Sequence, residues 1–118
     1  MENLTLNNSE RIETTILRNL FFNEDFTRKA LPFIKSQFFN KRDEAILFSE
    51  VEGFVNKYKN LPTKESILIE LGQRKDITED ELKEIKEVVK TLNPQEDDLQ
   101  WLFDTTEKFC KDRAVHNA

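Results

Sequence analysis

Apolar residues recur every three or four positions along most of this chain, which is the spacing of one face of an α-helix. In the first such stretch, residues 9–21, the side chains of Ile12, Ile16 and Leu20 fall on one face. The polar residues 7–9 offer side-chain oxygens that can cap the start of this helix. The chain is therefore expected to open with an amphipathic helix.

A second, short helix is predicted over residues 24–31, with Asn23 as its N-cap. Pro32 and the pair Phe38 and Phe39 then interrupt the helical spacing, since proline cannot continue a helix interior. The segment around them is expected to be packed but irregular.

The longest apolar stripe follows over residues 41–58 and predicts a long helix. Pro62 then marks a turn, because the residue before a proline is driven towards extended backbone. Thr63 is placed to cap a further helix that ends at Gly72.

Two more helices are predicted in the last third of the chain. Thr78 and Glu81 have the spacing of a capping box, in which each side chain bonds the other residue's backbone amide. Pro94 ends the helix that begins there, and a tail helix runs from residue 97 or 98 to the last residue. We expect these two helices to form an antiparallel hairpin over about residues 78–118. The predicted fold is all-α: one domain, 1–118, made of a small helical bundle followed by a C-terminal antiparallel helical hairpin.

The tail helix shows no residue that would end it, because no Gly or Pro follows its apolar stripe. Helices commonly end on Gly or Asn followed by polar residues. This pattern leads us to expect that the chain is a piece of a longer protein.

Composition narrows the class of protein. Of the 118 residues, 37% are hydrophobic and ten are Phe, which is enough for one core. The net charge of −5 argues against a grip on nucleic acid, which normally needs a basic surface, and favours a protein partner. The single Cys110 rules out an internal disulfide, no apolar run approaches the roughly 20 residues of a membrane span, and residues 1–8 lack the features of a secretory signal. A cytoplasmic location is expected.

The chain carries no pattern typical of catalysis. Its only glycines, Gly53 and Gly72, cannot form a phosphate-binding loop, so no nucleotide site is predicted. Cys110 and His116 lie six residues apart, which places them on different helix faces and disfavours a metal site. Carboxylates cluster at helix starts, where they complement the helix dipole. We predict a non-enzyme, with no catalytic, cofactor-binding or metal-binding residue.

The expected hairpin exposes more apolar surface than one subunit can cover. Trp101 lies off the stripe formed by its neighbours, so the hairpin would have two apolar faces. A second copy of the chain could shield the further face as a symmetric interface; alternatively, Trp101 covers the turn near Pro94 of its own hairpin. The residues predicted for self-association are Ile85, Val88, Val89, Leu92, Leu99, Trp101 and Leu102.

The order and spacing of several short segments resemble the N-terminal domain of the DnaB-like replicative DNA helicases, most closely the form in T-even-type bacteriophages. The resemblance covers essentially the whole chain. It rests on the opening helix with its ILRNLFF, Phe38 and Phe39, the long helix ending at Tyr58, the LPT of residues 61–63, and the tail, with Trp101, Leu102, residues 106–109, Arg113, Ala114, Asn117 and Ala118.

The resemblance implies a role in assembly. In that family the N-terminal domain is a small helical bundle with a hairpin, hairpins pair two subunits, and three pairs form a collar on a hexameric ring. Primase and the helicase loader are the implied protein partners, and contact of this domain with DNA is expected to be weak or absent. ATP and Mg are implied only for a separate motor domain, and the location would be the bacterial host cytoplasm.

Two alternatives to this assembly role remain open. One is a free-standing adaptor that binds a single protein target; coding sequence beyond Ala118 would separate it from a helicase. The other is a module for single-stranded nucleic acid, with Phe38 and Phe39 as a stacking platform beside Lys41 and Arg42. Core packing is the competing interpretation of the two phenylalanines.

Overall fold

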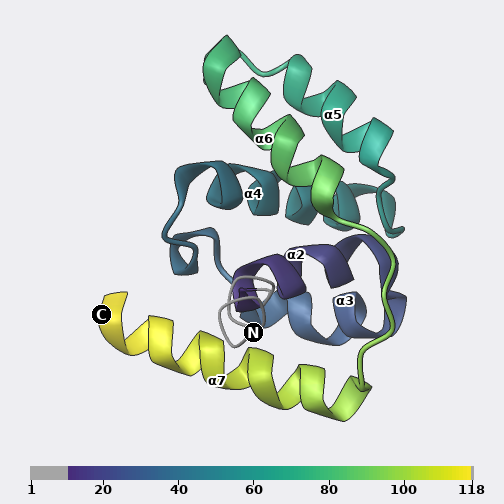
Figure 1. The fold of residues 1–118 in the computed structure, drawn as a ribbon, viewed down its shortest axis with the longest axis vertical. Helices are drawn as coiled ribbons and strands as arrows, with labels where there is room; N and C mark the ends of the chain where they lie inside the picture. Colours follow the sequence, from purple (N-terminus) through teal and green to yellow (C-terminus); the bar gives the residue numbers. More distant parts are fainter. Residues whose placement is uncertain (1–10, 118) are drawn as a thin grey trace, which may run out of the picture.

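The computed structural model describes residues 11–117, and every regular element among them is helical (Figure 1). The predicted all-α fold is confirmed. In chain order the elements are the α-helices α2 (Ile12–Phe22) and α3 (Glu24–Ala30), the 3-10 turns η1 (Leu31–Phe33) and η2 (Ser36–Phe38), and the α-helices α4 (Arg42–Tyr58), α5 (Lys64–Gly72), α6 (Glu79–Thr91) and α7 (Leu99–Asn117).

Helix starts follow the predicted caps closely. The Asn23 Oδ1 accepts a hydrogen bond of 3.0 Å from the Phe26 backbone amide at the start of α3. Thr78 and Glu81 form the predicted capping box at α6, with bonds of 3.1 and 2.9 Å. Thr63 caps α5 in the same way. The predicted capping by residues 7–9 lies outside the described residues.

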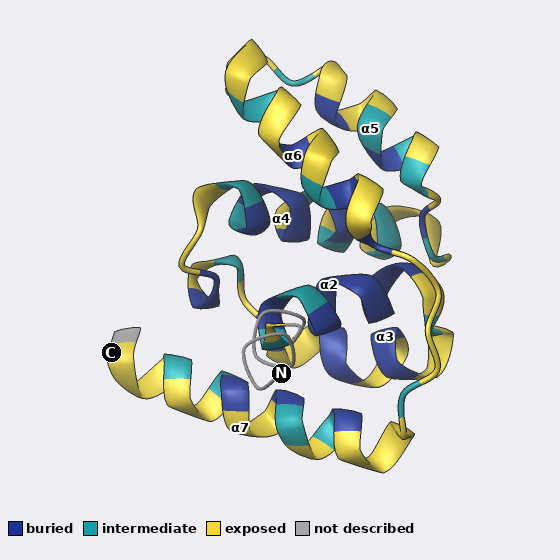
Figure 2. Ribbon diagram, viewed as in Figure 1, coloured by how far each residue is buried: buried dark blue, intermediate teal, exposed yellow. Residues whose placement is uncertain are grey.

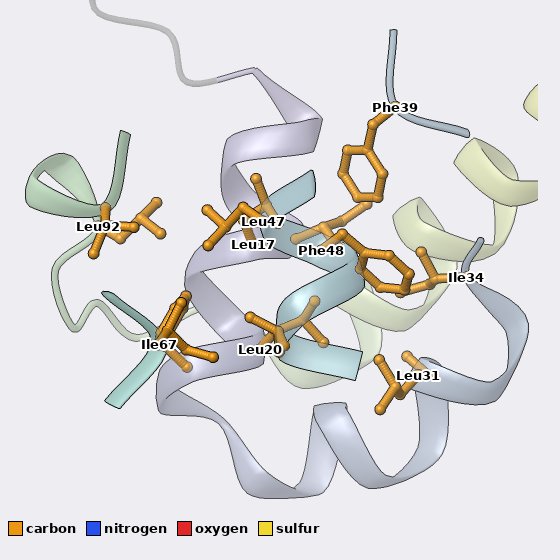
Figure 3. Packing of buried hydrophobic residues seen from close by; sticks show 14 of the residues in the cluster. Leu17, Leu20, Leu31, Ile34, Phe39, Leu47, Phe48, Ile67 and Leu92 are labelled. Carbon is orange, nitrogen blue, oxygen red and sulfur yellow. The ribbon is translucent and has the colours of Figure 1, made fainter. Parts of the chain in front are cut away.

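The core lies mainly between α2 and α4. Leu17 and Leu20 of α2 face Leu47 and Phe48 of α4, and all four side chains are fully buried (Figure 3). The Phe39 ring stacks on the Phe48 ring with centroids 5.3 Å apart. The irregular segment between α3 and α4 therefore contributes to the core, as its aromatic content predicts.

The remaining helices cover this core from different sides. α6 packs on α4 and α5, whereas α7 packs on α2, α3 and η2. Figure 1 shows α5 and α6 side by side at one end of the molecule and α7 across the other. The predicted hairpin of α6 with α7 is therefore wrong, and the neighbouring pair is α5 with α6.

The segment that joins α6 to α7 explains this difference. Residues 92–98 form no turn; they run along the side of the molecule from one end to the other (Figure 1). Seven extended residues can span about 23 Å, which is enough to carry α7 away from α6. Pro94 ends α6 as predicted, but the chain after it remains extended and does not reverse direction.

None of the helices within residues 11–117 combines the length and the apolar content needed to cross a bilayer.

Candidate self-association surface

Four of the seven residues predicted for self-association belong to the core of the subunit. Ile85, Val89 and Leu92 are at most 1% exposed, and Leu102 is fully buried. Because their surfaces are already covered, these four residues cannot face a second copy. Their predicted place at an interface is therefore wrong.

The other three predicted residues keep some accessible surface. Trp101 is 49% exposed and Leu99 is 36% exposed, both in the first turn of α7, and Val88 of α6 is half-buried. The Asp98 carboxylate accepts a hydrogen bond of 2.8 Å from the Trp101 backbone amide, which fixes the start of the helix. Since α6 and α7 form no hairpin, the alternative in which Trp101 covers a hairpin turn is also wrong.

Figure 2 shows that one side of α7 is exposed along most of its length, and the sequence makes most of these exposed residues polar. Gln100 donates to Asp104, and ion pairs join Lys108 to Asp112 and Lys111 to Glu107, all with i, i+4 spacing. Such exposed pairs each contribute only about 0.3–0.5 kcal/mol. The exposed apolar residues of this face lie near its two ends, at Trp101 and at Val115, which is 75% exposed.

An ion pair with α2 holds the segment that leads into α7. The Arg18 guanidinium, 3% exposed, donates to Asp97 at 2.7 Å, and the Asn19 amide donates to the same carboxylate oxygen at 3.0 Å. Burial alone would raise the pKa of Asp97, but the hydrogen bonds from Asn19 and Arg18 outweigh it and lower that pKa. The carboxylate therefore stays charged and anchors the segment.

A second ion pair holds the far half of α7. Arg113 donates to the buried Glu13 carboxylate at 2.7 Å and to the Phe38 carbonyl at 2.6 Å, and its guanidinium lies 4.8 Å from the centre of the Phe109 ring. Arg11, 3.2 Å from Glu13, extends the network to a buried carboxylate of α4. The sequence did not reveal this pair, because its partners lie 100 positions apart.

Between these two attachments, a groove of about 560 Å³ separates α7 from α3 and η1. Its lining includes Phe33, which is 71% exposed, Phe103 and Cys110, whose burial raises the thiol pKa. The Thr106 hydroxyl below has no hydrogen-bond partner among the described residues. The groove lies beside the buried face of α7, where Leu102, Thr106 and Phe109 are at most 6% exposed.

The proposed stacking platform for nucleic acid is not available. Phe38 and Phe39 are at most 5% exposed, and both rings pack against Phe109. Arg42 forms an ion pair with Glu81 at the start of α6. A base cannot stack on rings that the protein's own core covers, so core packing is the correct interpretation of the two phenylalanines.

The described residues also contain no cluster of three or more His, Cys, Asp or Glu side chains placed to hold a metal ion. Cys110 is half-buried at the groove, and His116 is exposed in the last turn of α7.

The chain matches no family model. It is 28% identical over 103 residues to the DnaB-like replicative helicase of Enterobacteria phage T4. The matched region is 87% of this chain but only 22% of the phage protein, so the chain spans about a fifth of the length of the curated relative that it matches. The similarity relates nearly the whole of this domain to one part of a phage replicative helicase.

Proposed function

We propose that this chain is the non-catalytic assembly domain of a phage replicative DNA helicase. Copies of the domain associate with one another, and the assembled domains present a docking surface for primase or the helicase loader. ATP and Mg would be handled by a motor domain elsewhere in such a helicase. In this proposal the domain organises the association of subunits, and a separate motor domain carries out the catalysis.

The observation that carries this proposal is the extent of the similarity to the phage T4 helicase. A match over 87% of this chain but only 22% of the helicase supports the interpretation of the chain as one domain of such a protein. The exposed residues Leu99 and Trp101 on α7 support a surface for association, because half-exposed aromatic side chains are enriched at protein interfaces.

The proposal is tested by Trp101→Ala. Removing a buried interface aromatic typically weakens association by about 1–3 kcal/mol, which corresponds to a change in Kd of roughly 5-fold to 150-fold. Sedimentation equilibrium of wild type and variant would measure it. Ile69→Ala is the matched control, since Ile69 is 59% exposed but lies on α5, at the other end of the molecule. A wild-type domain that stays monomeric at near-millimolar concentration would contradict the proposal.

A free-standing adaptor remains the second candidate. Coding sequence downstream of Ala118 separates the two: a phosphate-binding loop supports the helicase and a stop codon supports the adaptor.

A further inference from the structure

The solvent face of α7 carries a pattern that specifies how two copies of this helix would pair. Trp101, Asp104, Lys108, Lys111 and Val115 are all exposed and are spaced by three, four, three and four residues. This alternation places the five residues on one face of the helix, with an apolar residue at each end and charged residues between them. The other faces of α7 contact α2, α3 and η2, so this seam is its most exposed side, and Asp104 and Lys111 also line the groove beside α3 and η1.

We infer that α7 pairs with α7 of a second copy in antiparallel orientation, about a two-fold axis midway between Glu107 and Lys108. The inference rests on the proposed self-association and adds its face and its direction. A two-fold axis at this point brings each Asp104 opposite the partner's Lys111, because the two positions lie seven residues apart on one face.

The same axis also brings the apolar ends of the seam together. Trp101 of one copy comes to lie beside Ala114 and Val115 of the other, at both ends of the pair. The 49% exposed indole and the 75% exposed valine would thus cover each other. The apolar contact and the charge pair each occur twice, once on either side of the axis, as a symmetric interface requires.

A parallel pairing has the opposite properties. It would place Asp104 against Asp104 and Lys111 against Lys111, and like charges in contact oppose association. The ion pairs that the seam lysines form within their own helix do not prevent the antiparallel arrangement. They join Lys108 to Asp112 and Lys111 to Glu107, and the four side chains are at least 59% exposed. Exposed pairs of this kind exchange partners at little cost.

Charge exchange tests the pairing. Asp104→Lys and Lys111→Asp each turn two attractive contacts per dimer into repulsive ones, so each should raise Kd about tenfold at low salt. The double variant restores opposite charges across the axis and should return Kd to within about twofold of wild type. The matched control is Lys90→Asp, an exposed lysine of α6 that, like Lys111, pairs with a carboxylate of its own helix.

A crosslinking measurement reports the direction independently. In a Cys110→Ala background, one tagged chain carries Trp101→Cys and an untagged chain carries Val115→Cys. Antiparallel pairing predicts that the mixed disulfide dimer dominates on oxidation. Assembly that is insensitive to both charge variants, or crosslinks only between like chains, would overturn this inference and leave the proposed function standing. A wild-type chain that remains monomeric at near-millimolar concentration would overturn both.

Discussion

Two charged side chains of α2 and the segment before α7 show how single residues position a whole helix. Arg18 and Asp97 are 3% and 12% exposed, and the ion pair between them joins positions 79 residues apart. A buried pair of this kind gains little over a well-packed apolar pair, but removing one partner leaves an uncompensated charge. Losing Asp97 alone should therefore destabilise the fold, although the intact pair adds little over an apolar one.

Replacing Asp97 by Asn should lower the free energy of unfolding by about 2–3 kcal/mol at neutral pH, because Arg18 loses its counter-charge. Since the folded protein lowers the pKa of Asp97, the stabilisation is fully present above the ordinary Asp pKa of about 3.9 and is lost as pH falls through the lowered value. Urea unfolding of wild type and Asp97→Asn between pH 7 and about pH 3 measures the difference in their free energies of unfolding. This difference should shrink below about pH 4.

The matched control for this series is Asp112→Asn, whose carboxylate is 59% exposed and pairs with Lys108 on the same helix. It should change stability by less than about 0.5 kcal/mol. A difference between wild type and Asp97→Asn that stays constant over the whole pH range would contradict the ion-pair account.

At the scale of elements, α7 is held by the core residues Leu102 and Phe109 and by two polar attachments, one just before its start and one in its far half. Arg113 supplies the second attachment through Glu13 and the Phe38 carbonyl. The groove lies alongside α7 between these two attachments. The orientation of α7 therefore depends on both its apolar packing and the two polar attachments.

Arg113→Met should lower the free energy of unfolding by about 2–3 kcal/mol, because Glu13 becomes a buried carboxylate with one counter-charge fewer. It should also increase the rate of amide hydrogen exchange in the last two turns of α7, while the rates in α5 and α6 change less. Arg28→Met is the control, since the pair of Arg28 with Glu24 is exposed, and it should cost no more than about 0.5 kcal/mol. Uniform exchange across the molecule would argue against a local attachment.

Leu92, the residue that follows α6, gives a prediction about a residue that was expected at an interface. Leu92→Ala should lower the free energy of unfolding by about 2–5 kcal/mol, as large-to-small changes in a core do, and leave the Kd of the folded domain unchanged. Chemical denaturation and sedimentation measure the two quantities separately. A Leu92→Ala variant that weakened association without changing stability would contradict this prediction and support an interface at Leu92.

Local signals made much of the fold predictable. Asn23, Thr63 and Thr78 were identified as caps because a cap acts on residues three positions away. The apolar stripe of α6 was also recognised, but a stripe states only that a face is buried, not which element buries it. Pro94 ended α6 as expected, whereas the extended path after it depends on Asp97 meeting Arg18, a contact far apart in sequence.

The residues predicted for self-association show the same limit: a local pattern does not state which elements pack together. Trp101 was selected because it lies off the apolar stripe of its helix, and this local argument holds in the structure. Ile85, Val89 and Leu92 were selected because α6 and α7 were expected to form a hairpin. Since α6 packs on α5 instead, their assignment failed with that expectation.

At the scale of the whole molecule, the charge and the burial of the aromatic rings oppose a role in binding nucleic acid. The net charge is −5, and Phe38 and Phe39 lie in the core. The domain should show no binding to a single-stranded oligonucleotide at low salt, as measured by fluorescence anisotropy. Salt-dependent binding would instead support the single-strand module.

Self-association of the intact domain is the central claim, and sedimentation equilibrium from micromolar to near-millimolar concentration tests it most directly. The account predicts a mass that rises from the 14.0 kDa of one chain towards twice that value or beyond, with a shift of the midpoint to higher concentration in Trp101→Ala. A mass that stays at 14.0 kDa across the whole range would contradict it.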